Sequence, residues 1–85
     1  MASRTRAQYT ETYAVLPELL RTLREEAGLS QRLLGEQLDR PQSWIYNCEM
    51  GARRVDITEF VAWSEGCGVK PKVAFNRLLS ALGKA

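Results

Sequence analysis

Apolar residues recur at spacings of three and four along most of the chain, which is the period of one face of an α-helix. The clearest run covers residues 16–27, where one face carries Leu16, Leu19, Leu20, Leu23 and Ala27. Pro17 suits the first turn of this helix, and Gly28 suits the position just after its end. No stretch alternates convincingly with a period of two, so the pattern predicts an all-α fold.

Two short helices are predicted next, separated by only a few residues. Ser30 is a suitable N-cap for the first of them, which ends at Leu38. The tripeptide Asp-Arg-Pro at 39–41 interrupts the pattern, and the second helix runs from there to about residue 50. Two short helices joined this tightly have the geometry of a helix-turn-helix, which we place at about residues 30–50.

Two further helices complete the pattern. Asp56 followed by Glu59 fits the capping box that begins a helix. This helix is predicted to bury Ile57, Phe60 and Val61. The last helix is predicted from residue 70 or 71 to residue 82. The chain therefore reads as five helices.

Length and composition fit one small globular domain. The 85 residues allow a single small core, and 45% of them are hydrophobic. The net charge of +2 permits a polyanionic partner without requiring one. No apolar run approaches the roughly 18 residues that span a bilayer, and residues 1–13 lack the apolar region of a signal peptide. We therefore expect a cytoplasmic protein that binds no membrane.

Residues suited to catalysis or metal binding are scarce. The chain has no histidine, and its two cysteines, Cys48 and Cys67, stand alone. Neither a glycine-rich phosphate loop nor a paired-cysteine motif occurs. We therefore expect no enzyme activity, no metal, no cofactor and no small-molecule ligand. Both cysteines are interpreted as small core residues.

Several short motifs lie in register along the predicted helix-turn-helix: GLSQ at 28–31, LG at 34–35, QSWI at 42–45 and EMGARR at 49–54. In this order and spacing they resemble the XRE-type helix-turn-helix family of phage Cro and repressor proteins. The likeness covers roughly residues 9–80. It implies a compact lambda-repressor-like DNA-binding domain over residues 9–85. Arg4 and Arg6 precede this domain, and we interpret residues 1–8 as a flexible basic arm that follows the DNA backbone or enters a minor groove. The alternative is a disordered terminus.

The second helix of the motif, at about residues 42–50, has a polar face. At 100° per residue, one arc consists of Gln42, Ser43, Tyr46, Asn47 and Met50. The other side carries Ile45, Cys48 and Glu49. Short polar side chains on such an arc can meet base edges in the major groove, and a glutamine amide can pair with adenine through two hydrogen bonds. The resemblance assigns base reading to Gln42, Ser43 and Asn47, and Tyr46 shares their arc. The alternative is a solvated polar face.

Contacts with DNA phosphates are expected around this helix. Arg53 and Arg54 lie just beyond its end, where they can reach phosphates and set the register. By resemblance, Gln31 clamps a phosphate beside a helix N-terminus. Arg40 and Trp44 are further phosphate candidates. The alternative for Arg53 and Arg54 is that they are solvated loop charges.

Two positions carry predictions about structure. Glu49 falls on the inward side of its helix, where an unpaired carboxylate is costly. The resemblance places Arg24 opposite it, so we expect a structural Arg24–Glu49 ion pair that orients the reading helix. Asp39 occupies the turn position where the family usually has glycine, and aspartate tolerates left-handed backbone better than most residues.

The last helix has more apolar positions than so small a core easily absorbs. The residues in question are Phe75, Leu78, Leu79 and Leu82. Members of the family commonly pair through this region, and a two-fold dimer binds two half-sites about one helical turn apart. The resemblance thus implies a homodimer with these four residues at its interface. The alternative is that they only complete the core of the monomer.

The function implied is a sequence-specific, double-stranded DNA-binding transcriptional regulator. We expect it to act in the nucleoid as a repressor that binds a palindromic operator. The alternative is a helical adaptor or antitoxin-like protein whose main partner is another protein, such as a toxin or a second regulator. The modest charge and the residues Leu33, Trp44 and Tyr46 favour this second interpretation.

Overall fold

Helices make up nearly all of the regular structure. The computed structural model describes residues 12–84, so the predicted basic arm with Arg4 and Arg6 lies outside the described residues. Within the described range the elements are α2 (Val15–Glu26), α3 (Gln31–Leu38), α4 (Gln42–Glu49), α5 (Ile57–Gly66) and α6 (Pro71–Ala81). The prediction of an all-α, five-helix fold is confirmed. In this part of the chain no helix is long and apolar enough to cross a membrane.

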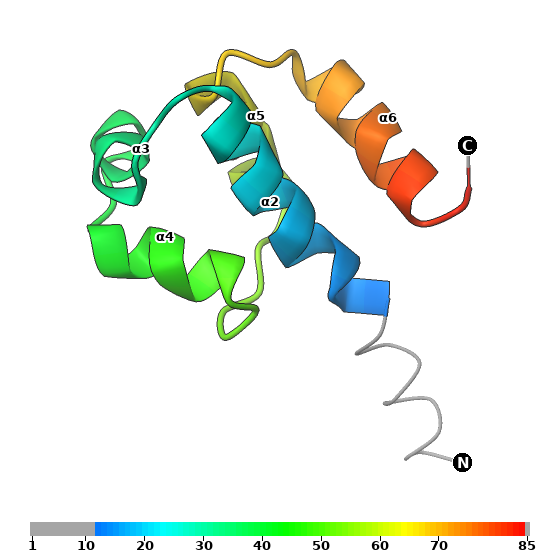
Figure 1. The fold of residues 1–85 in the computed structure, drawn as a ribbon, viewed down its shortest axis with the longest axis horizontal. Helices are drawn as coiled ribbons and strands as arrows, with labels where there is room; N and C mark the ends of the chain where they lie inside the picture. The colour runs from blue at the N-terminus through cyan, green and yellow to red at the C-terminus, as the bar shows by residue number, and fades with distance from the viewer. Residues whose placement is uncertain (1–11, 85) are drawn as a thin grey trace.

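The helices are arranged around a central pair. In Figure 1, α2 and α5 occupy the middle of the molecule, α3 and α4 lie on one side, and α6 lies on the other. Helix α3 packs against α4 and α5, α4 packs against α2, and α6 packs against both central helices. The two helices of the predicted helix-turn-helix are therefore neighbours at one end of the fold.

Local hydrogen bonds explain where the helices begin. The Ser30 hydroxyl accepts a hydrogen bond from the backbone N–H of Leu33 at 3.0 Å, which caps α3. At α5, the Asp56 side chain accepts from the backbone N–H of Glu59 at 2.8 Å. The Glu59 carboxylate accepts in return from the backbone N–H of Asp56 at 3.0 Å. Both predicted caps are confirmed.

The core draws side chains from every helix. Its fully buried large members are Leu20, Leu23, Leu34, Ile45, Cys48 and Trp63. The indole N–H of Trp63 donates to the backbone carbonyl of Leu20 at 3.0 Å, so this large ring is buried without losing a hydrogen bond. This contact joins the two central helices, α2 and α5.

The predicted buried face of α5 was partly wrong. Phe60 is buried as expected, but Ile57 is 64% exposed and Val61 is also exposed. The buried stripe instead continues through Trp63 and Ser64. A serine in this stripe is tolerated because its hydroxyl donates to the Phe60 carbonyl at 2.8 Å. Since Asp56 caps the helix, Ile57 is the first residue of α5 and points away from the core.

Helix α6 contributes little to the core. Ala74 is its one fully buried residue, whereas Val73 and Phe75 on either side of it are exposed. Leu78 is half-buried and packs against the core, and Leu79 and Leu82 are also half-buried. The helix therefore retains apolar surface, and its role in a dimer stays a prediction.

Candidate nucleic-acid interface

The turn between α3 and α4 depends on two residues. Asp39 has a φ of 56°, so it adopts the left-handed conformation that the sequence pattern suggested. The backbone N–H of Arg40 then donates to the carbonyl of Gly35 at 2.8 Å. A Cβ atom at Gly35 would lie 2.5 Å from the Arg40 carbonyl oxygen, so the tight approach requires glycine at this position. This turn sets the angle at which α4 leaves α3.

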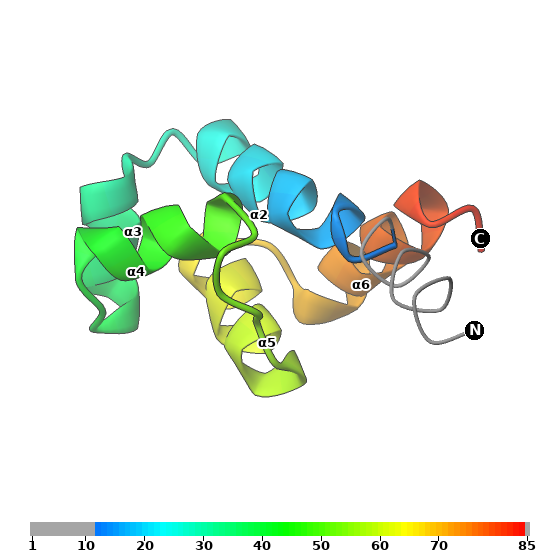
Figure 2. The same ribbon diagram turned by 90° about the horizontal axis from the view of Figure 1, so that it is seen from below.

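Helix α4 presents the polar arc expected from its sequence. Ile45 and Cys48 are completely buried and hold the helix on the core. The exposed side carries Gln42, Ser43, Tyr46, Asn47 and Met50. Figure 2 shows α4 lying beside α3 at the end of the molecule far from α6. An exposed helix at one end of a fold is sterically able to enter a groove of duplex DNA.

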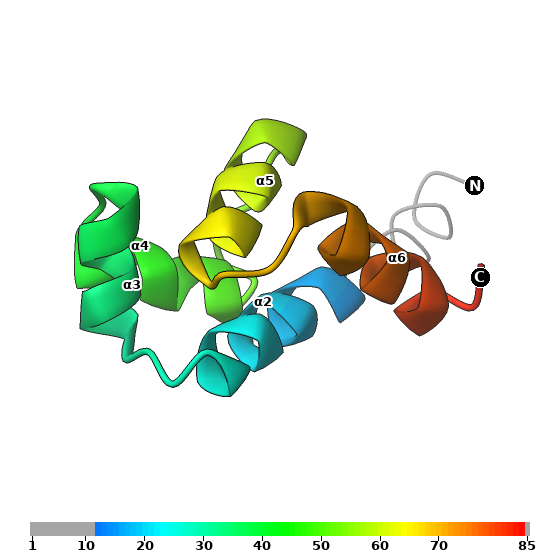
Figure 3. The same ribbon diagram turned by 90° about the horizontal axis from the view of Figure 1, so that it is seen from above.

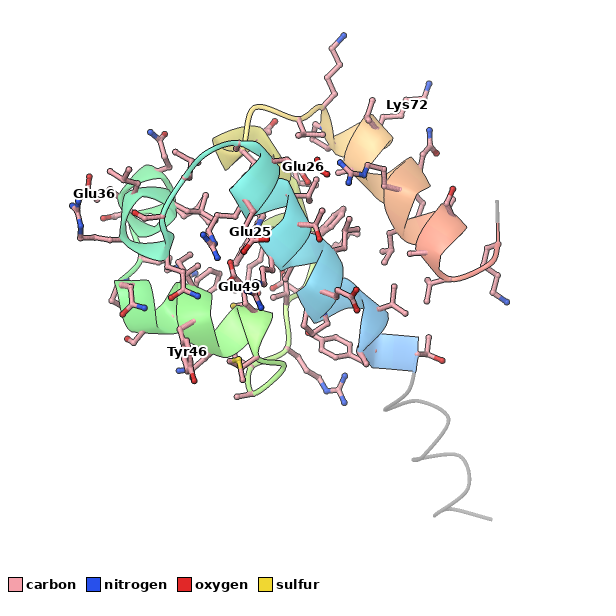
Figure 4. The ribbon with its side chains drawn as sticks, viewed as in Figure 1. Glu25, Glu26, Glu36, Tyr46, Glu49 and Lys72 are labelled. Carbon is pink, nitrogen blue, oxygen red and sulfur yellow. The ribbon has the colours of Figure 1, made fainter. Side chains whose placement is uncertain are left out.

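A chain of hydrogen bonds connects the core to the first residue of this arc. Arg24 on α2 donates to both carboxylate oxygens of Glu49, from Nε at 2.6 Å and from Nη2 at 3.0 Å. Gln31 on α3 donates from Nε2 to the same carboxylate at 3.0 Å. Gln42 donates from its own Nε2 to Oε1 of Gln31 at 2.6 Å. In Figure 4, Glu49 points into the space between α4 and α2, whereas Tyr46 lies on the outer side of α4.

Glu49 determines which group donates and which accepts in each of these hydrogen bonds. A carboxylate only accepts hydrogen bonds, so the Gln31 amide must turn its NH₂ group toward Glu49 and its oxygen toward Gln42. The Gln42 side chain then keeps its own oxygen and one N–H for an outside partner. An adenine base edge offers the matching acceptor and donor.

The Arg24–Glu49 pair that the family resemblance implies is present, and it is well shielded from solvent. The side chains are only 11% and 3% exposed. The hydrogen bond to Glu49 raises the pKa of the Arg24 guanidinium above its usual value. Arg24 also donates to the Leu29 carbonyl at 2.8 Å, so it ties α2 to the start of the helix-turn-helix. Both charges are therefore compensated inside the protein.

A second polar group lies beside the amino-terminal half of α4. We call Arg40, Trp44, Arg53 and Glu59 the Trp44 cluster. The guanidinium groups of Arg40 and Arg53 lie over the Trp44 ring, 4.6 and 4.9 Å from its centre. Arg53 donates two hydrogen bonds to the carboxylate of Glu59, both at 3.0 Å. Arg40 approaches the same carboxylate at 3.7 Å.

This geometry changes the expectation for two of the phosphate candidates. Trp44 is one of the phosphate candidates, but its indole N–H is buried and has no hydrogen-bond partner among the described residues. Arg53 is expected to contact a phosphate, with a solvated loop charge as the alternative, but its guanidinium is engaged by Glu59 and also donates to the Arg54 carbonyl at 2.7 Å. Glu59 was predicted only as a helix cap, because nothing in the sequence pattern shows which arginines it faces.

Arg54, which follows Arg53 in the chain, has a different environment. The Arg54 guanidinium lies over the ring of Tyr13, 4.3 Å from its centre. The Tyr13 hydroxyl accepts a hydrogen bond from the backbone N–H of Val55 at 2.8 Å. Tyr13 therefore holds the loop after α4 against the chain just before α2. The sequence pattern did not indicate this contact, which joins residues 42 positions apart.

The pKa shifts of the carboxyl and thiol groups near α4 have structural causes. The hydrogen bonds from Arg53 hold the pKa of the Glu59 carboxyl below its usual value. Burial raises the pKa of the Cys48 thiol and raises that of Cys67 to about 11, so both stay protonated at neutral pH. Within the described range, no group of three or more His, Cys, Asp or Glu residues could hold a metal ion.

Comparison with known proteins agrees with this arrangement. A family model described as a helix-turn-helix domain matches residues 16–83. The solved structure of an XRE-family like protein from Pseudomonas syringae pv. tomato str. DC3000 is 32% identical, with a TM-score of 0.80 over 91% of this chain and 94% of that one. The wild-type restriction-modification controller protein C.Esp1396I shares the fold at 20% identity, with a TM-score of 0.77 over 87% and 96% of the two chains. No curated protein matches the chain.

The family match includes the whole helix-turn-helix and the Trp44 cluster. It extends from the start of α2 to the residues after α6 and contains the α3–α4 pair with its tight turn. The XRE-family like protein from Pseudomonas covers nearly the whole chain at 32% identity. The chain therefore belongs to the XRE-type helix-turn-helix family and is a DNA-binding transcriptional regulator.

Proposed function

We propose that the protein reads a specific sequence of double-stranded DNA by inserting α4 into the major groove, and that it represses transcription by occupying an operator. The observation that carries the proposal is the orientation of Gln42. Its side chain is exposed on the reading face, and its amide is oriented through Gln31 by the buried Glu49. A pre-oriented amide discriminates adenine from other bases better than a freely rotating one.

The other base contacts are assigned to the same arc. Ser43, Tyr46 and Asn47 are exposed beside Gln42 on α4. Ser43 and Asn47 offer short polar ends, and the Tyr46 ring offers an apolar surface for a thymine methyl group. Asn47 follows Ser43 by one helical turn, so the two can contact successive base pairs.

Phosphate contacts are assigned to the edges of this surface. Arg40 lies in the turn, two residues before the first residue of α4, and its side chain is 45% exposed, so it can reach a phosphate. Arg54 is exposed in the loop after α4. Gln31 lies at the first position of α3, where unpaired backbone N–H groups favour an anion. Such contacts position the helix without reading sequence.

A homodimer is part of the proposal. Phe75, Leu79 and Leu82 follow the helical spacing along one side of α6, and Ile57 and Val61 do so along α5. These stripes leave apolar surface on two helices that pack against each other. Pairing of two copies would bury this surface and would present two reading helices to a palindromic operator. Since the DNA is the partner, association with the nucleoid is also part of the proposal.

The test is selection of duplexes from a random library with the purified protein at moderate salt. We expect enrichment of an inverted repeat with half-sites about one helical turn apart. A single enriched half-site would support reading by α4 and contradict the dimer. The absence of enrichment, with only weak salt-sensitive retention, would contradict sequence-specific binding.

A second candidate function is an adaptor that binds another protein. Three large apolar or aromatic side chains favour it, because exposed apolar surface is typical of sites that bind proteins: Leu33 on α3, Tyr46 on α4 and Met50 just after α4. Salt dependence separates the two. Affinity for DNA should fall steeply between 50 and 200 mM salt, on the order of 10³-fold for six phosphate contacts. A shallow slope would favour the adaptor.

A further inference from the structure

The connection between the reading helix and α5 passes through side chains. Helix α4 packs directly on α2 and α3. Toward α5, Trp44 adds a contact to the core packing of Ile45 and Cys48, because its ring centre lies 6.2 Å from that of Trp63. The Trp44 ring in turn lies beneath the guanidinium groups of Arg40 and Arg53. The Trp44 cluster is therefore a side-chain bridge between the amino-terminal half of α4 and α5.

Glu59 is the fixed member of this bridge. Its side chain is 14% exposed, and its two oxygens accept two hydrogen bonds from Arg53 and one from the backbone of Asp56. A carboxylate held by several donors cannot rotate freely, so it fixes the plane of the guanidinium that it binds. Arg53 is thereby kept over the Trp44 ring, and Arg40 is kept nearby.

We propose that Glu59 is a positioning residue for DNA recognition. It acts through Arg53 and Arg40 on Trp44, and so sets the position of the amino-terminal end of α4, where Gln42 and Ser43 lie. This inference rests on the proposed function, because it assigns to Glu59 a role in sequence discrimination. It also gives Arg53 a role inside the protein in place of a direct phosphate contact.

Loss of the Glu59 charge should affect sequence-specific and non-specific DNA binding in opposite directions. Without the Glu59 charge, two arginines become mobile cations next to the reading surface, and the net charge rises by one. Attraction to any phosphate backbone is then preserved or strengthened. The amino-terminal end of α4 is held less firmly, so contacts that depend on its placement weaken. The ratio of specific to non-specific affinity must therefore fall.

The test compares Glu59→Gln with Asp56→Ala. Glutamine at this position still completes a capping box, so α5 keeps its start while the arginines lose their carboxylate. Asp56→Ala removes the cap and leaves the arginines paired. Affinities are measured by fluorescence anisotropy for the selected duplex and for a scrambled one. We expect the specificity ratio to fall about tenfold in Glu59→Gln, the size of one base contact, and to stay within twofold in Asp56→Ala.

Arg53→Lys provides a second variant with unchanged net charge. Lysine remains a good phosphate ligand as a point charge, but it cannot form the paired hydrogen bonds to a carboxylate or lie flat on an indole. If Arg53 positions α4, this variant loses discrimination as Glu59→Gln does. If Arg53 binds phosphate, the variant keeps its specificity ratio.

These measurements separate a failure of the role of Glu59 from a failure of the proposed function. A specificity ratio kept in Glu59→Gln and in Arg53→Lys, with a wild-type protein that prefers one sequence, would overturn the inference and leave the proposed function standing. An equal loss in Asp56→Ala would also overturn it, because the loss would then come from the start of α5. A wild-type protein without sequence preference would overturn both.

Discussion

At the scale of single residues, one carboxylate organises the reading surface. Glu49 binds Arg24 and Gln31 at once, and through Gln31 it orients Gln42. A partner for Glu49 could be expected from the sequence, because a carboxylate on the inward side of a helix requires one, and the family resemblance identified that partner as Arg24. The contact of Gln31 with Gln42 could not, because it depends on the turn that brings the starts of α3 and α4 together.

Removal of the Glu49 charge should destabilise the protein strongly. In Glu49→Gln the guanidinium of Arg24 stays buried without a counter-charge, and we expect the free energy of unfolding to fall by about 3 kcal/mol. Urea denaturation measures this change. Glu25→Gln is the control, because it removes an exposed ion pair with Arg21 and should change stability by less than about 1 kcal/mol. Equal losses in the two variants would contradict a buried, structural pair.

Gln42→Ala should relax sequence preference at one base step. The loss of a bidentate contact lowers affinity for the preferred duplex by roughly 1–3 kcal/mol, and duplexes altered at that base pair should lose much less. Binding to a set of single-base variants of the selected site measures this pattern. A uniform loss on every duplex would show instead that Gln42 only contacts the backbone.

At the scale of the elements, the turns and helix caps could be predicted from the sequence. The face that each helix buries could be predicted only in part. Ser30, Asp39 and the Asp56–Glu59 box act within a few residues, so their types and spacing suffice to predict them. The exposed side of α5 depends on which helices cover it. Ile57 and Val61 were therefore misplaced, since a hydrophobic residue in the first turn of a helix looks the same whether or not anything covers it.

The close approach at Gly35 makes the turn sensitive to one methyl group. In Gly35→Ala the Cβ atom would lie 2.5 Å from the Arg40 carbonyl oxygen, so α4 must shift. We expect a loss of roughly 1–3 kcal/mol in unfolding free energy, together with weaker specific DNA binding. Thermal unfolding and anisotropy measure the two effects. Gln37→Ala, on the exposed side of the same helix, should leave both nearly unchanged; a Gly35→Ala protein as stable as this control would contradict the crowding.

The start of α5 should make the protein sensitive to acid. Arg53 lowers the pKa of the Glu59 carboxyl, so the unfolded state binds protons more readily than the folded state as the pH falls. This stabilisation is present above the usual carboxyl pKa of 4.5 and is lost as the pH falls through the lower folded value. The melting temperature of Glu59→Gln should therefore be lower than that of wild type at pH 7, and the difference should shrink as the pH falls below 4.5 and through the folded pKa of Glu59. A constant difference across this range would contradict the pairing.

At the scale of the whole molecule, the reading surface and the apolar stripe of α6 are far apart. The two ends are separated by the central helices in every view, and Figure 3 shows α6 alongside α2 and α5 with α3 and α4 beyond them. The number of helices and their order could be predicted from the sequence. The Trp44 cluster and the Tyr13–Val55 contact could not, because they join segments whose relative placement only the packed core determines.

Pairing through α6 should be sensitive to charge at Phe75. This side chain is 42% exposed, so Phe75→Glu should leave the monomer folded while placing a carboxylate at the proposed interface. We expect the dimer dissociation constant to rise at least about tenfold, measured by sedimentation equilibrium. Asn76→Glu makes the same charge change at a neighbouring exposed position of α6 and should not do so. Equal effects, or a wild-type monomer, would contradict this interface.

The side chains on the exposed face of α4 differ in how they are held, and this difference affects how easily the protein can acquire a new DNA target. Gln42 is linked through Gln31 to a buried ion pair, so its identity is coupled to the integrity of the core. In the described part of the chain, the side chains of Ser43, Tyr46 and Asn47 form no such link and face solvent. New operator preferences can therefore arise by changes at these three positions with little loss of stability. Duplicated copies of such a gene could diverge in their targets while keeping one unchanged scaffold.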